Sequence, residues 1–230
     1  MLRILSLLFT AAVLTLGTSC GPVIDQGASK TPVVPTPRPV PTRGPDPKFS
    51  EAASVAGKAT YRVELRPVGE GVTATNPPEL AYSRLGANER YEFSAGGQRV
   101  AAYRSDATWQ QCAVGGACTA VPRERALEKS LAGQLLSQIG AQPDSFDGVY
   151  IGTRNVLKED TTCFELHATA QSPAGTPQVA VVCFNKIGAP VAVDATAPQQ
   201  DLRLKPQEIK LEATLATLTV KAADVTPPAP

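Results

Sequence analysis

The chain has 230 residues, enough for one folded domain or for one domain with tails. Charged residues make up 19% and the hydrophobic set 43%, so a packed core is attainable and global disorder is disfavoured. The net charge of +1 argues against a dedicated nucleic-acid binder, which needs a basic surplus. The single histidine, His167, excludes a site built from several histidines.

The first twenty residues have the layout of a secretory signal peptide, predicted over residues 1–19. The apolar run Ile4–Leu16 spans about 20 Å as a helix, too short for a bilayer core of roughly 30 Å, so a membrane-spanning helix is the weaker interpretation. Small residues that end in Cys20 resemble the lipobox of bacterial lipoproteins, which implies that this thiol is lipidated and becomes the new N-terminus. The lipobox has Leu three residues before the cysteine, whereas Leu16 stands four before. An ordinary cleaved signal peptide is the alternative.

The cysteine count supports lipidation, because five is an odd number and an odd thiol in an exported chain requires an explanation. With Cys20 assigned to the lipid, the other four can pair completely in an oxidising compartment. Three pairings are open, and we favour the local one, Cys112 with Cys118 and Cys163 with Cys183. A metal held by four thiolates is the alternative, but separations of 6 and 20 residues do not fit a zinc ribbon, so no metal is expected.

A proline-rich tether is predicted over residues 20–48, beginning with the lipidated cysteine. Eight of the 28 residues from Gly21 to Lys48 are proline, which fixes φ and lacks an amide donor. The stretch therefore favours extended polyproline II and reaches roughly 85 Å at about 3.1 Å per residue. We expect a spacer that lifts a domain off a membrane. A ligand for a proline-recognising module is the alternative.

One folded domain is predicted over residues 49–225, followed by a short tail at 226–230. It begins with a helix, Phe49–Ala59, for which Ser50 is the expected N-cap. Alternation of apolar and polar residues then predicts five strands. These strands cover residues 60–66, 79–85, 90–95, 99–105 and 107–113.

The second half begins with an amphipathic helix predicted over Arg123–Ile139, whose apolar stripe recurs every fourth residue. Five further strands are predicted, with a hairpin turn at 185–188. They cover residues 150–157, 162–170, 178–184, 190–196 and 208–220. Strands and helices do not alternate, so the sequence predicts an α+β fold in which an antiparallel sheet carries helices on one face.

Spaced residues in the second half resemble the LolA-like superfamily of exported bacterial lipoproteins, which includes the periplasmic lipoprotein carrier and the mycobacterial LppX and LprG lipoproteins. The resemblance covers about residues 49–228 and rests on Cys163–Leu166, Cys183–Phe184, Gly188, Leu211–Ala213 and Asp224 ahead of Pro227–Pro228. It implies a strongly curved antiparallel sheet, a half-open β-barrel of about 10–11 strands with helices on the concave face. In several members the cavity between sheet and helices holds acyl chains.

Two function classes stay open. The first is a membrane-anchored extracytoplasmic module that binds or carries a lipid or another apolar molecule. Its candidate ligand-binding residues are Tyr61, Val63 and Leu65 on the sheet and Leu131 and Leu135 on the amphipathic helix. The second is a structural, sensory or protein-interaction lipoprotein with a filled core and no ligand.

No catalytic residue and no cofactor are expected. His167 faces outward on a predicted strand, and the sequence lacks a nucleophile elbow, a P-loop and a dinucleotide-binding fingerprint. Trp109 precedes Cys112 by three residues and is expected to pack near the first disulfide. The expected partners are a bacterial membrane, through the lipid on Cys20, and a lipid or apolar small molecule. No nucleic acid is expected, and the sequence names no protein partner.

Overall fold

The computed structural model describes residues 46–68, 77–113, 116–173, 175–196 and 208–228. Arg43–Pro230 forms one compact unit, which contains all of these residues. The predicted signal peptide, Cys20 and the tether up to residue 45 lie outside the described residues.

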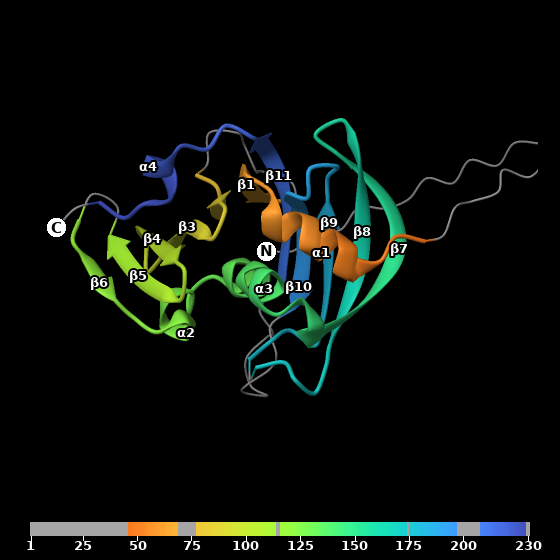
Figure 1. Ribbon diagram of the computed structural model, residues 1–230, viewed down its shortest axis with the longest axis horizontal. Coiled ribbons are helices and arrows are strands. Elements are labelled where there is room, and N and C mark those ends of the chain that lie inside the picture. The colour runs from red at the N-terminus through yellow and green to blue at the C-terminus, as the bar shows by residue number, and fades with distance from the viewer. Residues whose placement is uncertain (1–45, 69–76, 114–115, 174, 197–207, 229–230) are drawn as a thin grey trace, which may run out of the picture. The chain divides into compact units, whose positions relative to one another are not determined.

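A single antiparallel sheet of eleven strands dominates this unit (Figure 1). Its spatial order is β6-β5-β4-β3-β2-β1-β11-β10-β9-β8-β7, so the first and last strands of the chain are neighbours in the middle. The strands are β1 (Tyr61–Pro67), β2 (Leu80–Leu85), β3 (Asn88–Ala95), β4 (Gln98–Ser105), β5 (Thr108–Ala113), β6 (Cys118–Ala120), β7 (Phe146–Val156), β8 (Glu159–Ala168), β9 (Val179–Phe184), β10 (Pro190–Thr196) and β11 (Glu208–Thr217).

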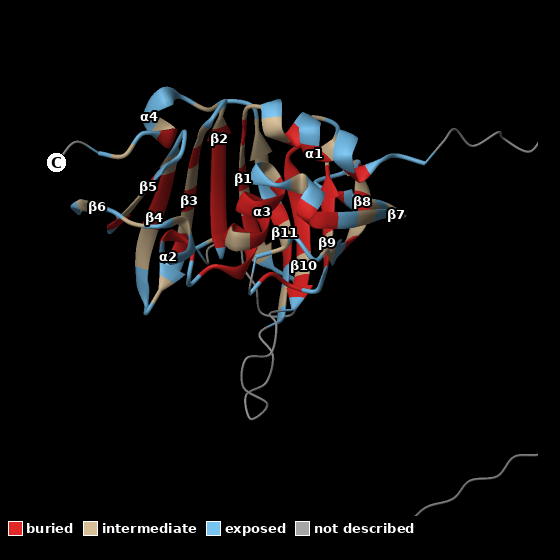
Figure 2. Ribbon diagram, turned by 60° about the horizontal axis from the view of Figure 1, so that its bottom comes forward, coloured by how far each residue is buried: buried red, intermediate tan, exposed pale blue. Residues whose placement is uncertain are grey.

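Four short helices and one 3-10 turn accompany the sheet, namely α1 (Phe49–Lys58), α2 (Arg123–Ala126), α3 (Leu131–Ala141), η1 (Pro143–Ser145) and α4 (Ala222–Val225). Helices α1 and α3 contact each other and cover one face of the sheet, which we call the inner face (Figures 1 and 2). α1 lies against β7, and α3 lies against β2 and β10. α4 lies against β2 and β3.

The core lies between the inner face and these helices. Phe49, the first residue of α1, packs edge-on against Phe164 of β8 with 5.7 Å between ring centroids. It lies directly over Gly148 of β7, where an added Cβ would come within 2.4 Å of the Phe49 side chain. Glycine at this position therefore lets the helix approach the strand closely.

The predicted helix over Arg123–Ile139 is two helices, because the chain turns between α2 and α3. Leu127 has φ −114° and ψ 9° and ends the first helix. Ser130 starts the second, since its side-chain oxygen accepts a hydrogen bond from the Gly133 amide at 3.1 Å. The apolar stripe survives the break, and Leu127, Leu131, Leu135 and Ile139 are all buried. At the first helix, Lys48 rather than Ser50 occupies the cap position.

The antiparallel sheet with helices on one face is confirmed, with β6 as a strand that the sequence did not predict. The expected strong curvature of a half-open barrel is not confirmed, because the sheet is neither closed nor strongly curled (Figure 2). A barrel closes when its outermost strands pair with each other. Here the outermost strands are β6, with 3 residues, and β7, with 11, and they do not pair.

Candidate functional site

The five candidate ligand-binding residues all belong to one packed hydrophobic cluster. Tyr61, Val63 and Leu65 point from β1 to the inner face, and Leu131 and Leu135 meet this cluster from α3. Their exposed fractions lie between 0% and 8%. The structure thus brings these five side chains together in a packed core.

Two small hollows adjoin α3 among the described residues. One of about 10 Å³ lies between α1, α3 and the ends of β1 and β2, which is room for about one water molecule. A second of about 100 Å³ opens beside α3, and it is lined by Leu127 and Leu135 together with Pro173, Thr176 and Pro177. Ligand pockets measure about 300–1,000 Å³, so neither hollow accommodates a whole lipid as it stands.

A buried carboxylate, Glu89 of β3, lies at the centre of a polar network on the inner face, with an exposed fraction of 0%. Arg84, directly opposite on β2, forms an ion pair with it, and Arg104 of β4 approaches Oε2 to 3.3 Å. The Tyr82 hydroxyl donates to Oε1 at 3.1 Å and the Tyr91 hydroxyl donates to Oε2 at 2.9 Å. Each carboxylate oxygen therefore has two donors, as a buried charge requires.

The network also connects the sheet to both inner helices. Arg84 Nη2 donates to the carbonyl of Gly57, in the last turn of α1, at 2.6 Å. In α3, a Cβ added to Gly140 would lie 3.2 Å from Arg84 Nη1 and 3.6 Å from Glu89 Oε1. Burial alone lowers the pKa of Arg84, but the interactions of the guanidinium with Tyr82 and Glu89 outweigh this effect and hold the pKa above its usual value. The guanidinium stays charged.

Three tyrosines and the chain's single tryptophan form a buried aromatic row across four strands. Tyr61 meets Tyr82 edge-on at 5.5 Å, Tyr82 stacks on Tyr91 at 4.5 Å, and Tyr91 stacks on Trp109 at 5.8 Å. The last contact crosses β4, on which Ala102 lies opposite Tyr91 and Arg104 lies opposite Trp109. Burial is the main cause that raises the pKa of all three tyrosines well above 10, so they remain protonated hydrogen-bond donors.

Two disulfides join adjacent strands on the outer face of the sheet, the face opposite α1 and α3. Cys112–Cys118 joins β5 to β6 and Cys163–Cys183 joins β8 to β9, which is the local pairing that we favoured. The expected contact between Trp109 and the first disulfide is wrong. Residues three apart on a strand face opposite ways, so Trp109 points to the inner face and Cys112 to the outer face.

His167 has the exposed position expected for it, on the outer face of β8. Its Nε2 lies 2.8 Å from Glu165 Oε1, and 46% of its side chain is exposed. In the part of the chain that the structure describes, no group of three or more His, Cys, Asp and Glu side chains is placed to hold a metal ion. Likewise, no described helix is long and apolar enough to cross a membrane.

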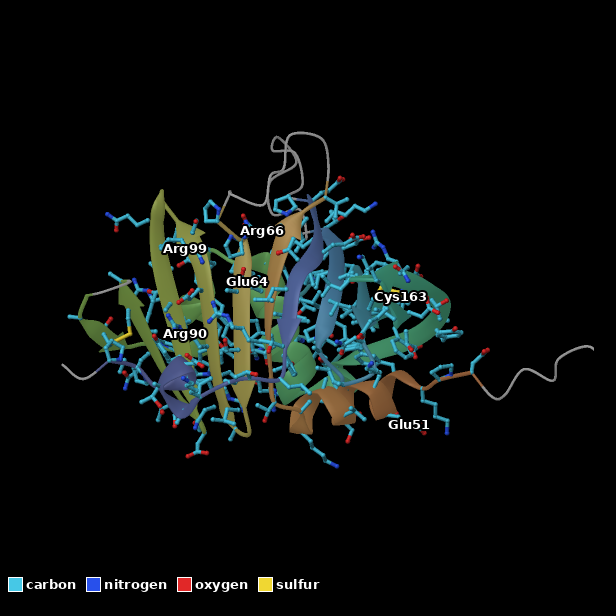
Figure 3. The ribbon with its side chains drawn as sticks, turned by 90° about the horizontal axis from the view of Figure 1, so that it is seen from above. Glu51, Glu64, Arg66, Arg90, Arg99 and Cys163 are labelled. Carbon is cyan, nitrogen blue, oxygen red and sulfur yellow. A yellow bond between two sulfur atoms is a disulfide. The ribbon has the colours of Figure 1, made fainter. Side chains whose placement is uncertain are left out.

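The outer face of β1, β3 and β4 carries ion pairs between neighbouring residues (Figure 3). Glu64 of β1 pairs with Arg66 at 3.7 Å, and Glu92 of β3 pairs with Arg90 and with Arg99 at 3.8 Å. Arg62 of β1 also pairs with Glu64, at 3.2 Å, so each of the two glutamates is shared by two arginines and the arginines outnumber the glutamates in this group.

The end of the β7–β8 hairpin folds over the outer face. β7 bulges between Tyr150 and Gly152, where Gly152 has φ +126°. Beyond the bulge, Arg154 pairs with Asp194 of β10 at 3.6 Å and with Glu212 of β11. These partners lie three and four strands away in the sheet, so the hairpin end crosses above β9 and β10.

A larger hollow, of about 520 Å³, lies under this hairpin end. We call it the outer hollow. Its walls are the β7–β8 turn, the β9–β10 turn and the end of β11. Leu157, Leu215 and Leu218 border it with exposed fractions of 41%, 42% and 58%. Its larger apolar lining residues are Val156, Leu157, Ile187, Val191, Leu215 and Leu218.

No family model matches the sequence, and no curated protein matches it. Among solved structures, a crystal structure of MucB is similar, with a TM-score of 0.45 and 13% identity over 79% of this chain and 62% of that one. The MucA/MucB complex of Pseudomonas aeruginosa gives a TM-score of 0.39 and 12% identity over 76% and 61%. A LolA superfamily protein from Nitrosomonas europaea gives 0.35 and 13% over 79% and 98%. The structure thus resembles LolA superfamily and MucB proteins at low sequence identity, and it spans less than two thirds of the MucB chain.

Sequence reasoning missed both the Glu89 network and the outer hollow. The network could have been predicted in part from the sequence, because a β2–β3 turn at Gly86 and Ala87 places Arg84 opposite Glu89 and Tyr82 opposite Tyr91. The outer hollow leaves no signal that a single sequence reveals, since its walls come from three separate turns and strand ends.

Proposed function

We propose that the protein is a membrane-anchored extracytoplasmic lipoprotein that acts by binding another protein, with a filled core and no lipid cargo. The observation that carries the proposal is the packing of the inner face, where Leu135 is fully buried and the hollow between α1, α3 and the sheet measures about 10 Å³. The cysteines support the compartment, because disulfides persist in oxidising environments.

The polar network also argues against cargo on the inner face. A lipid there would need α1 or α3 to move away from the sheet. Moving α1 would remove the Gly57 carbonyl from Arg84, and moving α3 would uncover the Arg84–Glu89 pair beneath Gly140. Unpairing or rehydrating a buried charge pair is costly, so the helices are better suited to fill the core than to open it.

The anchor is proposed from residues outside the described part. In this proposal residues 1–19 are removed, Cys20 carries the lipid, and residues 20–48 connect it to the domain at 49–225, with the tail 226–230 beyond. Each buried CH₂ of an acyl chain adds about 0.8 kcal/mol, so two chains hold a protein stably and one only marginally.

The test combines native mass spectrometry with a fluorescent fatty-acid titration of the domain expressed in a bacterium. We expect no co-purifying lipid and no saturable binding on the inner face. Leu135→Ala should destabilise the domain by about 2–5 kcal/mol, because it leaves a void in a filled core. Val149→Ala, at a half-exposed position on β7, is the control and should change stability little.

A lipid carrier is the second candidate, and the hollow of about 100 Å³ beside α3 is the observation that favours it. Leu127 and Leu135 already border this hollow, so an outward shift of α3 would enlarge it toward Tyr61, Val63 and Leu65. In that case lipid would co-purify, and Leu131→Ala and Leu135→Ala would alter lipid uptake at little cost in stability.

A further inference from the structure

Strand β11 has a neighbour on both sides only in its first half. β10 pairs with Glu208–Glu212, whereas β1 pairs with β11 as far as Thr217. From Ala213 to Thr217, the described strands give β11 a ladder partner on the β1 side alone. The other edge of this segment presents main-chain groups, and such an edge can pair with a further extended chain.

The outer hollow lies beside this edge. The half-exposed leucines Leu157, Leu215 and Leu218 border it, and the buried Val156 and Val191 form part of its lining. Its volume of about 520 Å³ provides room for several side chains. Clustered, exposed apolar side chains with a polar rim are typical of interaction sites.

The β7–β8 turn holds a leucine at the mouth of the outer hollow in an unfavourable backbone conformation. Leu157 has φ +56° and Lys158 has φ +62°, so both turn residues are left-handed. Two-residue hairpin turns of this kind favour Asn and Gly, which adopt positive φ at little cost. Strain of this sort is concentrated at functional sites. Here it accompanies an exposed leucine that borders the outer hollow.

The polar side chains around the outer hollow are already engaged. Lys186 Nζ lies 3.4 Å from Glu159 Oε1, which leaves the rim without net charge. The Asn185 side-chain oxygen accepts hydrogen bonds from the Ile187 and Ala189 amides at 3.2 and 2.9 Å. What the site offers a ligand is therefore apolar side chains together with the main chain of β11. An acyl chain would use only the first of these, whereas an extended peptide uses both.

We propose that the outer hollow binds an extended, uncharged segment of a partner protein, which adds as a strand to the edge of β11 from Ala213 to Thr217. Alternate side chains of the segment would pack against Leu157 and Leu215, while main-chain hydrogen bonds align it. The proposal rests on the proposed function, because it gives the binding of another protein a location and a chemistry.

The test uses the full mature chain with Cys20→Ala, labelled with ¹⁵N, and a panel of capped Thr/Val heptapeptides with Val, Leu or Ile at the centre. Binding should slow the hydrogen exchange of amides in Ala213–Thr217 by at least about tenfold. Two further peptides keep the same side chains but carry N-methyl groups on every second amide, one on the odd-numbered and the other on the even-numbered residues. They separate main-chain pairing from apolar contact. With one of these two peptides the protection of the β11 amides should disappear, because its N-methyl groups replace the donors that pair with β11.

Two variants and a control locate the site. Leu157→Asn introduces a residue that tolerates positive φ, so the variant should fold normally and raise the dissociation constant of the peptide about tenfold. Leu215→Thr should have a similar effect. Val149→Thr changes an equally exposed apolar residue far from the outer hollow on β7 and should change nothing.

Three outcomes would overturn the proposal. One is that no peptide of the panel protects Ala213–Thr217 at millimolar concentration. Another is that both N-methylated forms bind as well as the parent. The third is that myristate, and no peptide, binds in the outer hollow and is lost in Leu215→Thr, which makes the hollow a site for acyl chains. The proposed function fails separately, through lipid that co-purifies on the inner face and responds to Leu135→Ala.

Discussion

Replacing the buried carboxylate should be among the most damaging single changes in the domain. Glu89→Leu removes the acceptor of two guanidinium groups and of the Tyr82 and Tyr91 hydroxyls. Arg84 cannot relieve the loss by deprotonation, because a guanidinium stays protonated in proteins, and only 8% of its side chain is exposed. The variant therefore buries an unpaired charge.

The expected loss is about 3–5 kcal/mol, the usual effect of removing one partner of a buried ion pair. Domains of this size are stabilised by about 5–15 kcal/mol in total, so a large share of the stability would be lost. One kcal/mol shifts the melting temperature by about 2–4 °C at 150–250 residues, so Tm should fall by roughly 6–20 °C. Urea unfolding followed by Trp109 fluorescence measures the free energy of unfolding, and a thermal melt followed by circular dichroism measures Tm, both with the disulfides intact.

Two further variants make the experiment decisive. Glu92→Leu, on the outer face of the same strand, removes a carboxylate from a partly exposed ion pair and should cost about 1 kcal/mol or less. Arg84→Met combined with Glu89→Leu removes both charges and should recover most of the lost stability. The reasoning is refuted if Glu89→Leu unfolds within 1 kcal/mol of the wild type, or if the double variant is no more stable than Glu89→Leu alone.

Three other predictions concern pH, the anchor and the disulfides. Unfolded tyrosines ionise near pH 10 while the buried row stays protonated, so the unfolded state binds fewer protons and stability should fall as pH rises above about 10; phenolate absorbance that appears before unfolding would contradict this. Cys20→Ala should release the protein from membranes, and retention after high-salt washing would disprove the anchor. Replacing Cys163 and Cys183 together by Ala should cost about 3 kcal/mol, and replacing the Cys112–Cys118 pair about 2; peptide mapping that links Cys112 to Cys163 or Cys183 would exclude the pairing.

Features that depend on neighbours in the sequence could be predicted from it. Alternation in β1 shows which face Tyr61, Val63 and Leu65 share, and hairpin spacing explains why cysteines 20 residues apart come to lie opposite each other. The stripe of Leu127, Leu131, Leu135 and Ile139 correctly marks a buried surface even though the helix is interrupted at Ser130. The interruption itself escapes prediction, because a serine inside a helical pattern is a cap only if tertiary contacts bend the chain there.

Features that depend on how faces meet could not be predicted. From the sequence alone, Glu89 would be placed on the surface beside a hairpin turn. In the structure Arg84, Arg104 and two tyrosines surround its carboxylate. Likewise, an apolar sheet face and an apolar helix can enclose a cavity or fill it, and the difference lies in side-chain volumes across strands that are far apart in sequence. β6, with 3 residues, is too short to produce a period, and it is defined by its disulfide to β5.

The position of β11 between β10 and β1 has a consequence for biogenesis. Strands β1–β6 and strands β7–β10 form two groups in which each strand pairs with its neighbour in the sequence, so each group can form during synthesis. Each disulfide lies within one of these groups. The two groups join only through the last strand to be synthesised, which has its β1 partners about 150 residues earlier in the chain. A nascent chain therefore cannot complete its sheet before β11 is made. Any truncation before β11 leaves the edges of β1 and β10 exposed for aggregation.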